Sequence, residues 1–600
     1  MLSLTAEQQA IVDSPVKAVS WLFDVVDKNL AVHRWSTKRA YAGGLGGVVT
    51  DTASAGAYTD TTQAGVLAES VYDFKVINFG GVSLSRPRTE SGIMPPAELS
   101  FSIINNDNVF SADYFEGGYV TLSLYMGDGI GAEIKIRAWK FLVKRVEGSY
   151  QQLDFTCEDF FQQYIEGEYP GAEYRLESVE PVWAAGIAWE AGVAWTLGAE
   201  ATVRAYGMKV RDLFPSADGD IDDDCCVPLP FGNCYIPIRS AYIVADRFYA
   251  LGPTIAGGAA VTYSITACRT PRNYSAKTEY ASPAYAFDQY TKISAEGYSV
   301  QTLQAMIAPG PANGLFEDGD HYFDLPVKFT RSDTATMTNP ADIIEYVLKD
   351  MGVTSSDIDG VSFAAAGATY DSWGLAFNGA FWRVVPREKA LTLLLSMCHS
   401  TLIVGETLEL HVLDSTPQKI VASANVMKNG DIGVGTFSYS AFTRELSDCG
   451  NAVYSPTADA QDIGVNVLVP AKSSRIHIDP EPFSLPFVQD ATIAANIARV
   501  YLQRKLLKKS EERFTGKASM VALQPSDFVS MSGGNYGGLH SVIIDSMRIN
   551  KDVSIDFVCT GFSDTVENYG GSVTSPGVYA DPAEDGVVTD PGYDGVQTSI

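Results

Sequence analysis

The chain has 600 residues, 46% of them apolar and 19% charged, so at roughly 100–200 residues per domain it should fold into about three to five domains with sizeable cores. Lys and Arg total 43 against 72 Asp and Glu, which gives a net charge of −29. This acidic excess repels phosphate backbones and anionic lipid heads, and it argues against nucleic acid as a specifically bound partner. The first twenty residues have no signal-peptide pattern and no window is apolar enough to span a membrane, so we expect a soluble chain made in the cytoplasm.

Short runs rich in Val, Ile, Tyr and Thr lie between Gly, Asn and Asp, which predicts a multidomain, mainly β fold with α+β elements. Ala18 to Val32 alternates and turns at Asp27-Lys28-Asn29, so it begins a hairpin whose second strand is expected at His33–Tyr41. The strands expected to continue this sheet are Val71–Val76, Glu98–Asn105, Tyr119–Met126, Ile134–Glu147 and Tyr150–Glu158. After a lead-in at residues 1–17, residues 18–160 are therefore predicted to form one antiparallel barrel or sandwich.

A short internal repeat, WAAGIA-WEAGVA-WTLGAE, places Trp183, Trp189 and Trp195 six residues apart. Six is an even spacing, so the three rings share one face of an extended backbone, whereas in a helix they would not. We therefore predict short β-turn units within an inserted β-rich domain at residues 161–335. The indoles could bind sugar or protein as a strip, or they could pack on each other or on the next subunit, and we take them as candidate partner-interface residues.

The next segment offers two possible metal sites. The acidic loop Asp218–Asp224 supplies carboxylates that calcium prefers, but it does not have the glycine or the distant Glu at the positions of an EF-hand. Cys225, Cys226 and Cys234 could bind a metal as thiolates, but adjacent cysteines do not easily face one tetrahedral ion and the chain has no C-x-x-C pair. Eight cysteines are also too few for a disulfide framework, so reduced thiols are expected. We predict no metal and no cofactor.

Helical patterns begin in the second half of the chain. NPADIIEYVLKDMGV, from Asn339, has apolar residues at helical spacing and a closing Gly352, and Arg387–His399 is a second amphipathic stretch. Two short strands, Thr401–Gly405 and Thr407–Leu413, complete an α+β domain at about residues 336–420. The elements expected after it are strands at Phe437–Ser440 and Asp448–Tyr454, the clearest helix at Ala491–Lys509, and three closing strands at Arg513–Ser519, Asp527–Met531 and Ser541–Val558.

Residues 421–567 are thus predicted to form a second barrel-like domain, similar in topology to the first and containing helix 491–509. After Lys551 there is no Lys or Arg, and residues 568–600 form an acidic tail rich in Gly and Pro without an apolar period. We expect this tail to be mobile or ordered only against a partner, because it cannot bury a core of its own.

The sequence contains no recognisable catalytic motif. The six histidines, at positions 33, 321, 399, 411, 477 and 540, make no H-E-x-x-H or H-x-x-x-H pair, and Gly43–Gly47 is glycine-rich without the lysine or helix of a phosphate loop. The acid pairs Glu158/Asp159 and Glu166/Glu168 could serve a glycosidase, but the sequence does not give their carboxyl separation, and chance pairs are expected among 72 acids. We predict no catalytic residues, and a structural or interaction protein rather than an enzyme.

Four segments carry a resemblance to a known family. They are SWLFDVVDKNLAVHRWSTKRAYAGG, VPLPFGNCYIPIRSAYIVADRFYALG, NPADIIEYVLKDMGV followed by REKALTLLLSMCHSTLIVGETLELHVL, and LPFVQDATIAANIARVYLQRKLLKKSEERFTGKASMVALQPSDFVSMSG. The last has a helix, a strand and then a Pro-x-Asp-Val-like turn, here Pro525-Ser526-Asp527-Phe528-Val529. On these segments, about half the chain, the sequence resembles the baseplate hub, or tail-tip hub, proteins of long-tailed bacteriophages and gene transfer agents.

The resemblance implies a structural protein of the virion tail tip. It implies a homotrimer, in which two barrel-like hub domains per chain form a pseudo-sixfold ring that adapts the sixfold tail tube to a threefold tip and closes or gates the DNA channel during DNA ejection. The implied partners are the distal tail protein ring, the C-terminus of the tape measure protein, tail fibre or receptor-binding proteins, and the host cell envelope, with DNA passing without specific binding.

Some members of this family carry an iron–sulfur cluster or a peptidoglycan hydrolase module, and neither is carried over, because the matching cysteines and module are not found here. An alternative function is a cell-surface glycan-binding or glycan-cleaving protein, which the Trp repeat and the abundant Tyr would suit. Such a protein should be monomeric and should bind oligosaccharide on its own.

Overall fold

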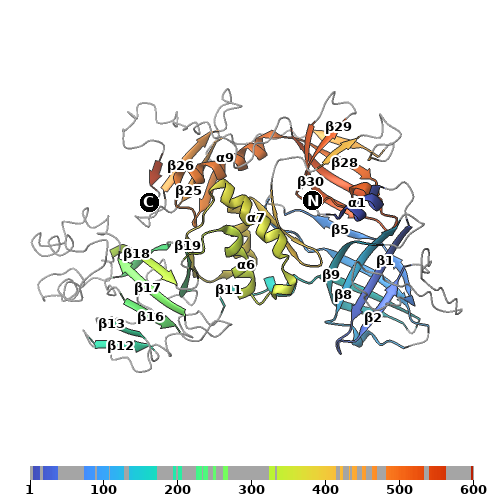
Figure 1. Cartoon of the computed structure of the whole chain (residues 1–600), viewed down its shortest axis with the longest axis horizontal. Helices are drawn as coiled ribbons and strands as arrows, with labels where there is room; N and C mark the ends of the chain where they lie inside the picture. Colours follow the sequence, from blue (N-terminus) through green and yellow to red (C-terminus); the bar gives the residue numbers. More distant parts are fainter. Residues whose placement is uncertain are drawn as a thin grey trace, which may run out of the picture.

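Figure 1 shows the computed structural model of the chain, in which two large sheets lie beside a helical middle part. The structure describes residues 4–13, 18–37, 73–87, 91–106, 109–127, 134–149, 151–171, 193–197, 201–205, 225–232, 234–240, 247–251, 261–267, 323–331, 334, 336–413, 419–422, 431–432, 436–441, 449–454, 463–468, 481–532, 540–562 and 596–598. The predicted mainly β, multidomain fold with a few helices is confirmed.

The N-terminal sheet has eight strands in the order β3-β2-β1-β8-β9-β10-β7-β4, antiparallel except for the pair β2 and β3. Its strands are β1 Ala18–Val26, β2 Val32–Ser36, β3 Asp73–Phe74, β4 Val76–Phe79, β7 Glu98–Ile104, β8 Tyr119–Gly127, β9 Ile134–Gly148 and β10 Gln152–Asp159. The predicted hairpin is confirmed, and its turn is held by the carboxylate of Asp27, which accepts hydrogen bonds from the backbone N–H groups of Asn29 and Ala31.

The C-terminal sheet has seven strands, six of them in the order β23-β29-β30-β31-β28-β24. They are β23 Lys419–Ala422, β24 Ser438–Ala441, β28 Lys508–Gly516, β29 Phe528–Ser532, β30 His540–Ile549 and β31 Ile555–Phe562. The seventh, β5 (Val82–Ser85), comes from the N-terminal part of the chain and pairs with β30. The single strand predicted over Ser541–Val558 is wrong, because the chain turns at Asn550–Ser554 and β30 and β31 form a hairpin.

The middle part combines helices with a small sheet. The two predicted helices are confirmed as α6 (Pro340–Asp350), whose first N–H groups are capped by Asn339, and α8 (Arg387–Met397). The predicted strands are present as β21 (Ser400–Val404) and β22 (Leu408–Val412). Another helix, α7 (Gly360–Trp373), escaped the sequence analysis, because Ala and Gly separate the large residues on its buried face.

Helix α9 (Ala491–Leu507) is confirmed but belongs to a different core from the one predicted. Its buried side chains Ala494, Ile497 and Ala498 lie in one hydrophobic cluster with the residues of α6, α7 and α8. The helix therefore packs with the middle part of the molecule and not inside the C-terminal sheet, to which the sequence analysis assigned it. The division of the chain into domains otherwise stays a prediction.

The remaining elements are short or lie at the edges of the described ranges. They are α1 Ala6–Asp13, β6 Gly92–Ile93, η1 Ala112–Tyr114, α2 Gln162–Ile165, β11 Glu168–Tyr169, β12 Val193–Leu197, β13 Ala201–Ala205, β14 Cys225–Phe231, β15 Cys234–Ser240, β16 Arg247–Leu251, β17 Val261–Ala267, β18 Phe323–Arg331, η5 Ser355–Asp357, β19 Gly379–Arg383, β20 Val385–Pro386, β25 Cys449–Tyr454, β26 Ile463–Leu468, β27 Glu481–Leu485, η7 Ala518–Met520 and β32 Val596–Thr598. Strand β32 pairs with β26, so this part of the acidic tail pairs with its own chain, whereas the sequence predicted a tail that is mobile or ordered only against a partner.

The two large sheets share one hydrophobic core. A single cluster contains Trp21 and Phe101 of the N-terminal sheet together with Ile544 and Phe557 of the C-terminal sheet. Across the same boundary the indole N–H of Trp21 donates a hydrogen bond of 3.0 Å to the carbonyl of Lys551. Burying one large apolar side chain contributes roughly 1.5–3 kcal/mol. Separating the sheets would expose these side chains to water, and a large part of the folding free energy would be lost.

The chain passes from one sheet to the other through two glycines. Strand β4 pairs with β7 in the N-terminal sheet and ends at Phe79, and β5 begins at Val82 in the C-terminal sheet. Between them, Gly81 has a φ of 101°, and a Cβ there would lie 2.2 Å from the carbonyl oxygen of Ile549. Only glycine fits this corner, since both the backbone conformation and the contact exclude a side chain.

We expect Gly81→Ala to lower the free energy of unfolding by at least about 3 kcal/mol, because it combines backbone strain with a clash against backbone. Gly117→Ala is the matched control: Gly117 also has a positive φ, 78°, but a Cβ there would meet nothing within 4 Å. The control should lose only about 1–2 kcal/mol. Urea unfolding of both variants measures the difference, and equal losses would contradict the close approach at Gly81.

Candidate functional site

Strand β9 carries three basic side chains that reach other parts of the molecule. The ammonium of Lys135 lies 2.8 Å from a carboxylate oxygen of Glu406, between β21 and β22, and that of Lys140 lies 2.7 Å from Asp357 in η5. The third is Arg137, which turns toward the C-terminal sheet. The strand is thus an anchor between the N-terminal sheet and the rest of the chain.

A β-bulge turns Arg137 into the core. The pairing of β9 with β8 shifts by one residue between Lys135 and Arg137. Before the shift the core contains the even-numbered Ile136, and after it the core contains the odd-numbered Trp139 and Phe141. Arg137 therefore lies on the same face as the two aromatic side chains. A regular strand could not bury positions 136 and 139 on one face, because they differ by an odd number of residues. Its guanidinium carbon lies 5.2 Å from the centre of the Trp139 ring.

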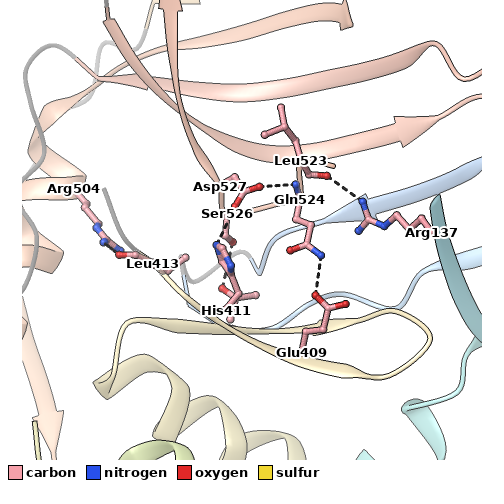
Figure 2. A network of polar contacts seen from close by, with 10 residues as sticks. Arg137, Glu409, His411, Leu413, Arg504, Leu523, Gln524, Ser526 and Asp527 are labelled. Carbon is pink, nitrogen blue, oxygen red and sulfur yellow. Dashed lines mark hydrogen bonds and ion pairs between the residues drawn. The ribbon is translucent and has the colours of Figure 1, made fainter. Parts of the chain in front are cut away.

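Figure 2 shows the partners of Arg137, which is only 6% exposed. Its Nη1 donates hydrogen bonds to the carbonyl oxygens of Leu523 (3.1 Å) and Val521 (3.3 Å). Burial lowers the pKa of Arg137, while the nearby carboxylates of Glu409 and Asp527 raise it. The cation is therefore stabilised by two carbonyl dipoles and two acids that come from other units of the fold.

The two acids are held by the turn before β29. The side chain of Gln524 donates to Glu409 of β22 at 3.0 Å, and its backbone N–H donates to Asp527 at 2.8 Å. The other carboxylate oxygen of Asp527 lies 3.3 Å from Nε2 of His411, also on β22. Between Gln524 and Asp527 in the chain, Ser526 adopts a φ of 75°. This is the turn Pro525–Val529 that carries part of the sequence resemblance, and it joins the C-terminal sheet to β22.

A second buried cation, Arg504 of α9, fixes the end of β22. It donates through Nη2 to the carbonyl of Leu413, and its guanidinium lies 5.7 Å from the centre of the Phe528 ring. The backbone N–H of Leu413 in turn donates to the carbonyl of His399 at 2.8 Å. Burial, reinforced by the charge of Arg504, lowers the pKa of His399 from 6.5 to about 3, so this imidazole is neutral at physiological pH.

We call this set of contacts the polar junction. Its charged and polar side chains come from the N-terminal sheet, the middle part and the C-terminal sheet, and they are Arg137, Thr401, Glu409, His411, Arg504, Gln524, Ser526 and Asp527. Arg137, Arg504 and Asp527 are almost fully buried. Such a network can fix three parts of the fold in one arrangement.

The sequence analysis did not single out the polar junction. The available signal was a basic residue inside the apolar strand IKIRAWKFL, where Arg137 occupies a position that burial should exclude. Its partners Glu409 and Asp527 lie 272 and 390 residues further along the chain by their numbers, so no local pattern connects them.

The carboxylates of the candidate pair Glu158/Asp159 do not meet at one site. Glu158 and Asp159 are consecutive on β10 and face opposite sides of the sheet: Glu158 pairs with Lys144 at 2.6 Å, whereas Asp159 is 2% exposed. Burial raises the pKa of Asp159 to about 6, but its carboxylate accepts hydrogen bonds from the backbone N–H groups of Ala97 and Phe161. Asp159 is therefore a structural carboxylate, closed off from any substrate.

Several predicted site residues lie outside what the structure describes. Trp183, Trp189 and the loop Asp218–Asp224 are outside the described residues, and Trp195 lies on β12, where it pairs with Val203 of β13. The described residues contain no group of three metal-ligating side chains and no helix long and apolar enough to cross a membrane. Three cysteines there, at positions 157, 398 and 559, are free and buried.

Comparisons with known proteins gave matches among solved structures alone. No protein-family profile and no curated protein matches the chain. A tail protein from Neisseria meningitidis MC58 matches 91% of this chain and 98% of its own, with 9% identity and a TM-score of 0.32. The 43 kDa tail protein of prophage MuSo2 from Shewanella oneidensis matches 83% and 97%, with 10% identity and a TM-score of 0.35. A chain of a gene transfer agent virion matches 60% and 88%, with 13% identity and a TM-score of 0.32.

By their names, these neighbours are two tail proteins, one of them from a prophage, and a chain of a gene transfer agent virion. Since all three TM-scores lie below 0.5, the functional proposal below is built on the residues of this chain.

We expect Arg137→Met to lower the free energy of unfolding by about 3–5 kcal/mol, because it leaves the buried acid Asp527 and the half-buried Glu409 without their cation. The matched control is Arg145→Met on the same strand. Arg145 is exposed and pairs only with the exposed Glu147, so its loss should change stability by no more than about 0.5 kcal/mol. Chemical unfolding of both variants provides the comparison, and a mild effect of Arg137→Met would show that the junction is dispensable.

His399 should make the fold less stable as the pH falls. Its folded pKa of about 3 lies below its ordinary value of 6.5, so between these values the unfolded chain binds a proton that the folded chain does not. The variant His399→Asn removes this group, and Asn tolerates the φ of 50° found here. The stability advantage of the wild type over the variant should shrink from about pH 7 to about pH 4 in urea unfolding at matched pH. An advantage that stays constant would contradict the buried neutral imidazole.

Proposed function

We propose that the chain is a structural component of a phage tail tip, a baseplate hub that adapts the sixfold tail tube to a threefold tip and closes or gates the DNA channel during infection. The observation that carries the proposal is the polar junction, which joins two large sheets at a fixed orientation across a shared core. An adapter between rings of different symmetry needs such rigid pairs, since each chain must present two contact surfaces at a constant spacing. The proposal assigns no catalytic role.

The proposed assembly is a homotrimer. Two sheet domains of similar topology in each of three chains give six comparable contacts, which match a sixfold ring, and cyclic closure leaves no open edge for further association. The partners we propose are the distal tail protein ring, the C-terminus of the tape measure protein, and tail fibre or receptor-binding proteins that reach the host cell envelope. The net charge of −29 suits a channel through which DNA slides without binding.

The purified chain should form a trimer in native mass spectrometry and a ring in negative-stain images. A glycan-binding protein would instead be monomeric and would bind oligosaccharide on its own, which a glycan array measures on the same sample. Monomers that bind glycan, or closed hexamers, would overturn the hub proposal.

Trp183, Trp189 and Trp195 are proposed as partner-interface residues. Their simultaneous change to Ala should leave a folded chain but weaken assembly or attachment of a neighbouring tail protein, each lost indole costing on the order of 1–3 kcal/mol. The matched control changes the same three residues to Phe and keeps an aromatic ring at each position. Thermal unfolding and particle assembly are measured on both variants, and unchanged assembly with a lower melting temperature would show local packing instead of an interface.

A further inference from the structure

Strand β5 occupies one half of a shared sheet edge. The first half of β30 pairs with β29, from His540 opposite Met531 to Ile543 opposite Phe528. The second half pairs with β5, from Ser546 opposite Ser85 to Ile549 opposite Val82. The opposite edge of β30 is covered by β31 along its length. Without β5, the second half of β30 would present an unpaired edge able to bind another strand.

Residues 80–86, which we call the strap, are held in this place by the pairing of β5 with β30, by two buried side chains and by the contacts of Arg86. Val82 and Leu84 point into the shared core, and Ser83 between them is exposed. At one end Arg86 follows the strand, and at the other the consecutive Gly80 and Gly81 form the corner from β4, where Gly81 has a φ of 101°. A strand of four residues with two buried side chains is short for a sheet.

An ion pair lies at the C-terminal end of the strap. Nε of Arg86 lies 2.5 Å from Asp545, whose other carboxylate oxygen accepts a hydrogen bond from Thr560 at 2.7 Å, and the backbone N–H of Arg86 donates to the carbonyl of Asp545. Asp545 lies at a bulge of β30, between Ile544 and Ser546, directly next to the residues that pair with β5. Burial disfavours the charged carboxylate and Arg86 opposes that effect, so the pair is mutually dependent.

We propose that the half of β30 from Ser546 to Ile549, with the carboxylate of Asp545 at its end, is a strand-binding site. The strap occupies it in cis, and an extended peptide with the pattern apolar-x-apolar-x-Arg occupies it when the strap is released. The strap itself shows this chemistry: the side chains of Val82 and Leu84 lie in the shared core, and Arg86 forms an ion pair with the carboxylate of Asp545. The site is independent of the proposed tail-tip role, since it follows from the pairing and the ion pair alone.

The full chain is tested with a synthetic peptide of the strap sequence, FGGVSLSRP, by fluorescence anisotropy. Apparent affinity rises with the fraction of open sites, so Arg86→Gln, which weakens the occupant in cis, should bind the peptide at least about tenfold more tightly than the wild type. A peptide with Gln in place of Arg should bind this variant more weakly. Adding Asp545→Asn to Arg86→Gln should abolish the preference between the two peptides.

The matched control is Arg548→Gln, which removes a hydrogen bond to the carbonyl of Gly80 and leaves the ion pair intact, and it should not gain peptide binding to the same degree. If Arg86→Gln does not fold, Arg86→Lys replaces it, with a smaller gain expected because a lysine keeps the charge but not the planar donors. Folding is checked by hydrogen exchange in the half of β30 paired with β29. A folded variant that binds neither peptide, or both equally, would overturn the proposal.

Discussion

The arrangement of the whole described structure depends on burying one cation, Arg137, among groups that arrive from elsewhere in the chain. A guanidinium removed from water is costly unless carbonyl dipoles and acids surround it, and here these groups are supplied by the turn before β29 and by β22. The cation is therefore satisfied only when the N-terminal sheet, the middle part and the C-terminal sheet meet in this arrangement. An apolar contact between the sheets could be as strong but would allow the sheets to shift relative to each other. The polar junction fixes them in one relative position, because its hydrogen bonds and ion pairs are directional.

Three kinds of joint act between the two sheets, and they have different physical limits. The shared apolar core gives most of the attraction and is not weakened by the screening of charges, since it depends on surface removed from water. The polar junction adds direction, and the neutral His399 near it makes that part of the fold sensitive to acid. The strap adds a crossing of the chain through Gly81. It is held by the pairing of β5 with β30, by the buried Val82 and Leu84, and by the ion pair of Arg86 with Asp545.

Local pattern was enough to predict most of the long elements, and long-range contact decided the rest. The hairpin at Asp27 and helices α6, α8 and α9 follow from alternation, apolar spacing and caps that lie within a few residues. Strand β5 could not be predicted because its four residues are a strand only against β30, more than 450 residues away by number. Arg137 could not be placed because a bulge, which the sequence does not mark, reverses the alternation. The Trp repeat stays a prediction.

Several of the basic residues of this acidic chain bind groups of the same chain. Lys135, Arg137, Lys140 and Arg86 are all engaged with acids or carbonyls of the same chain at boundaries between units. Each ion pair takes up one acid for one base, so these pairs leave the net charge of −29 unchanged. A partner that binds such a surface must bring positive charge or apolar area, because like charges across an interface cost several kcal/mol. The acidic surface therefore restricts the charge of the partners that this chain can bind.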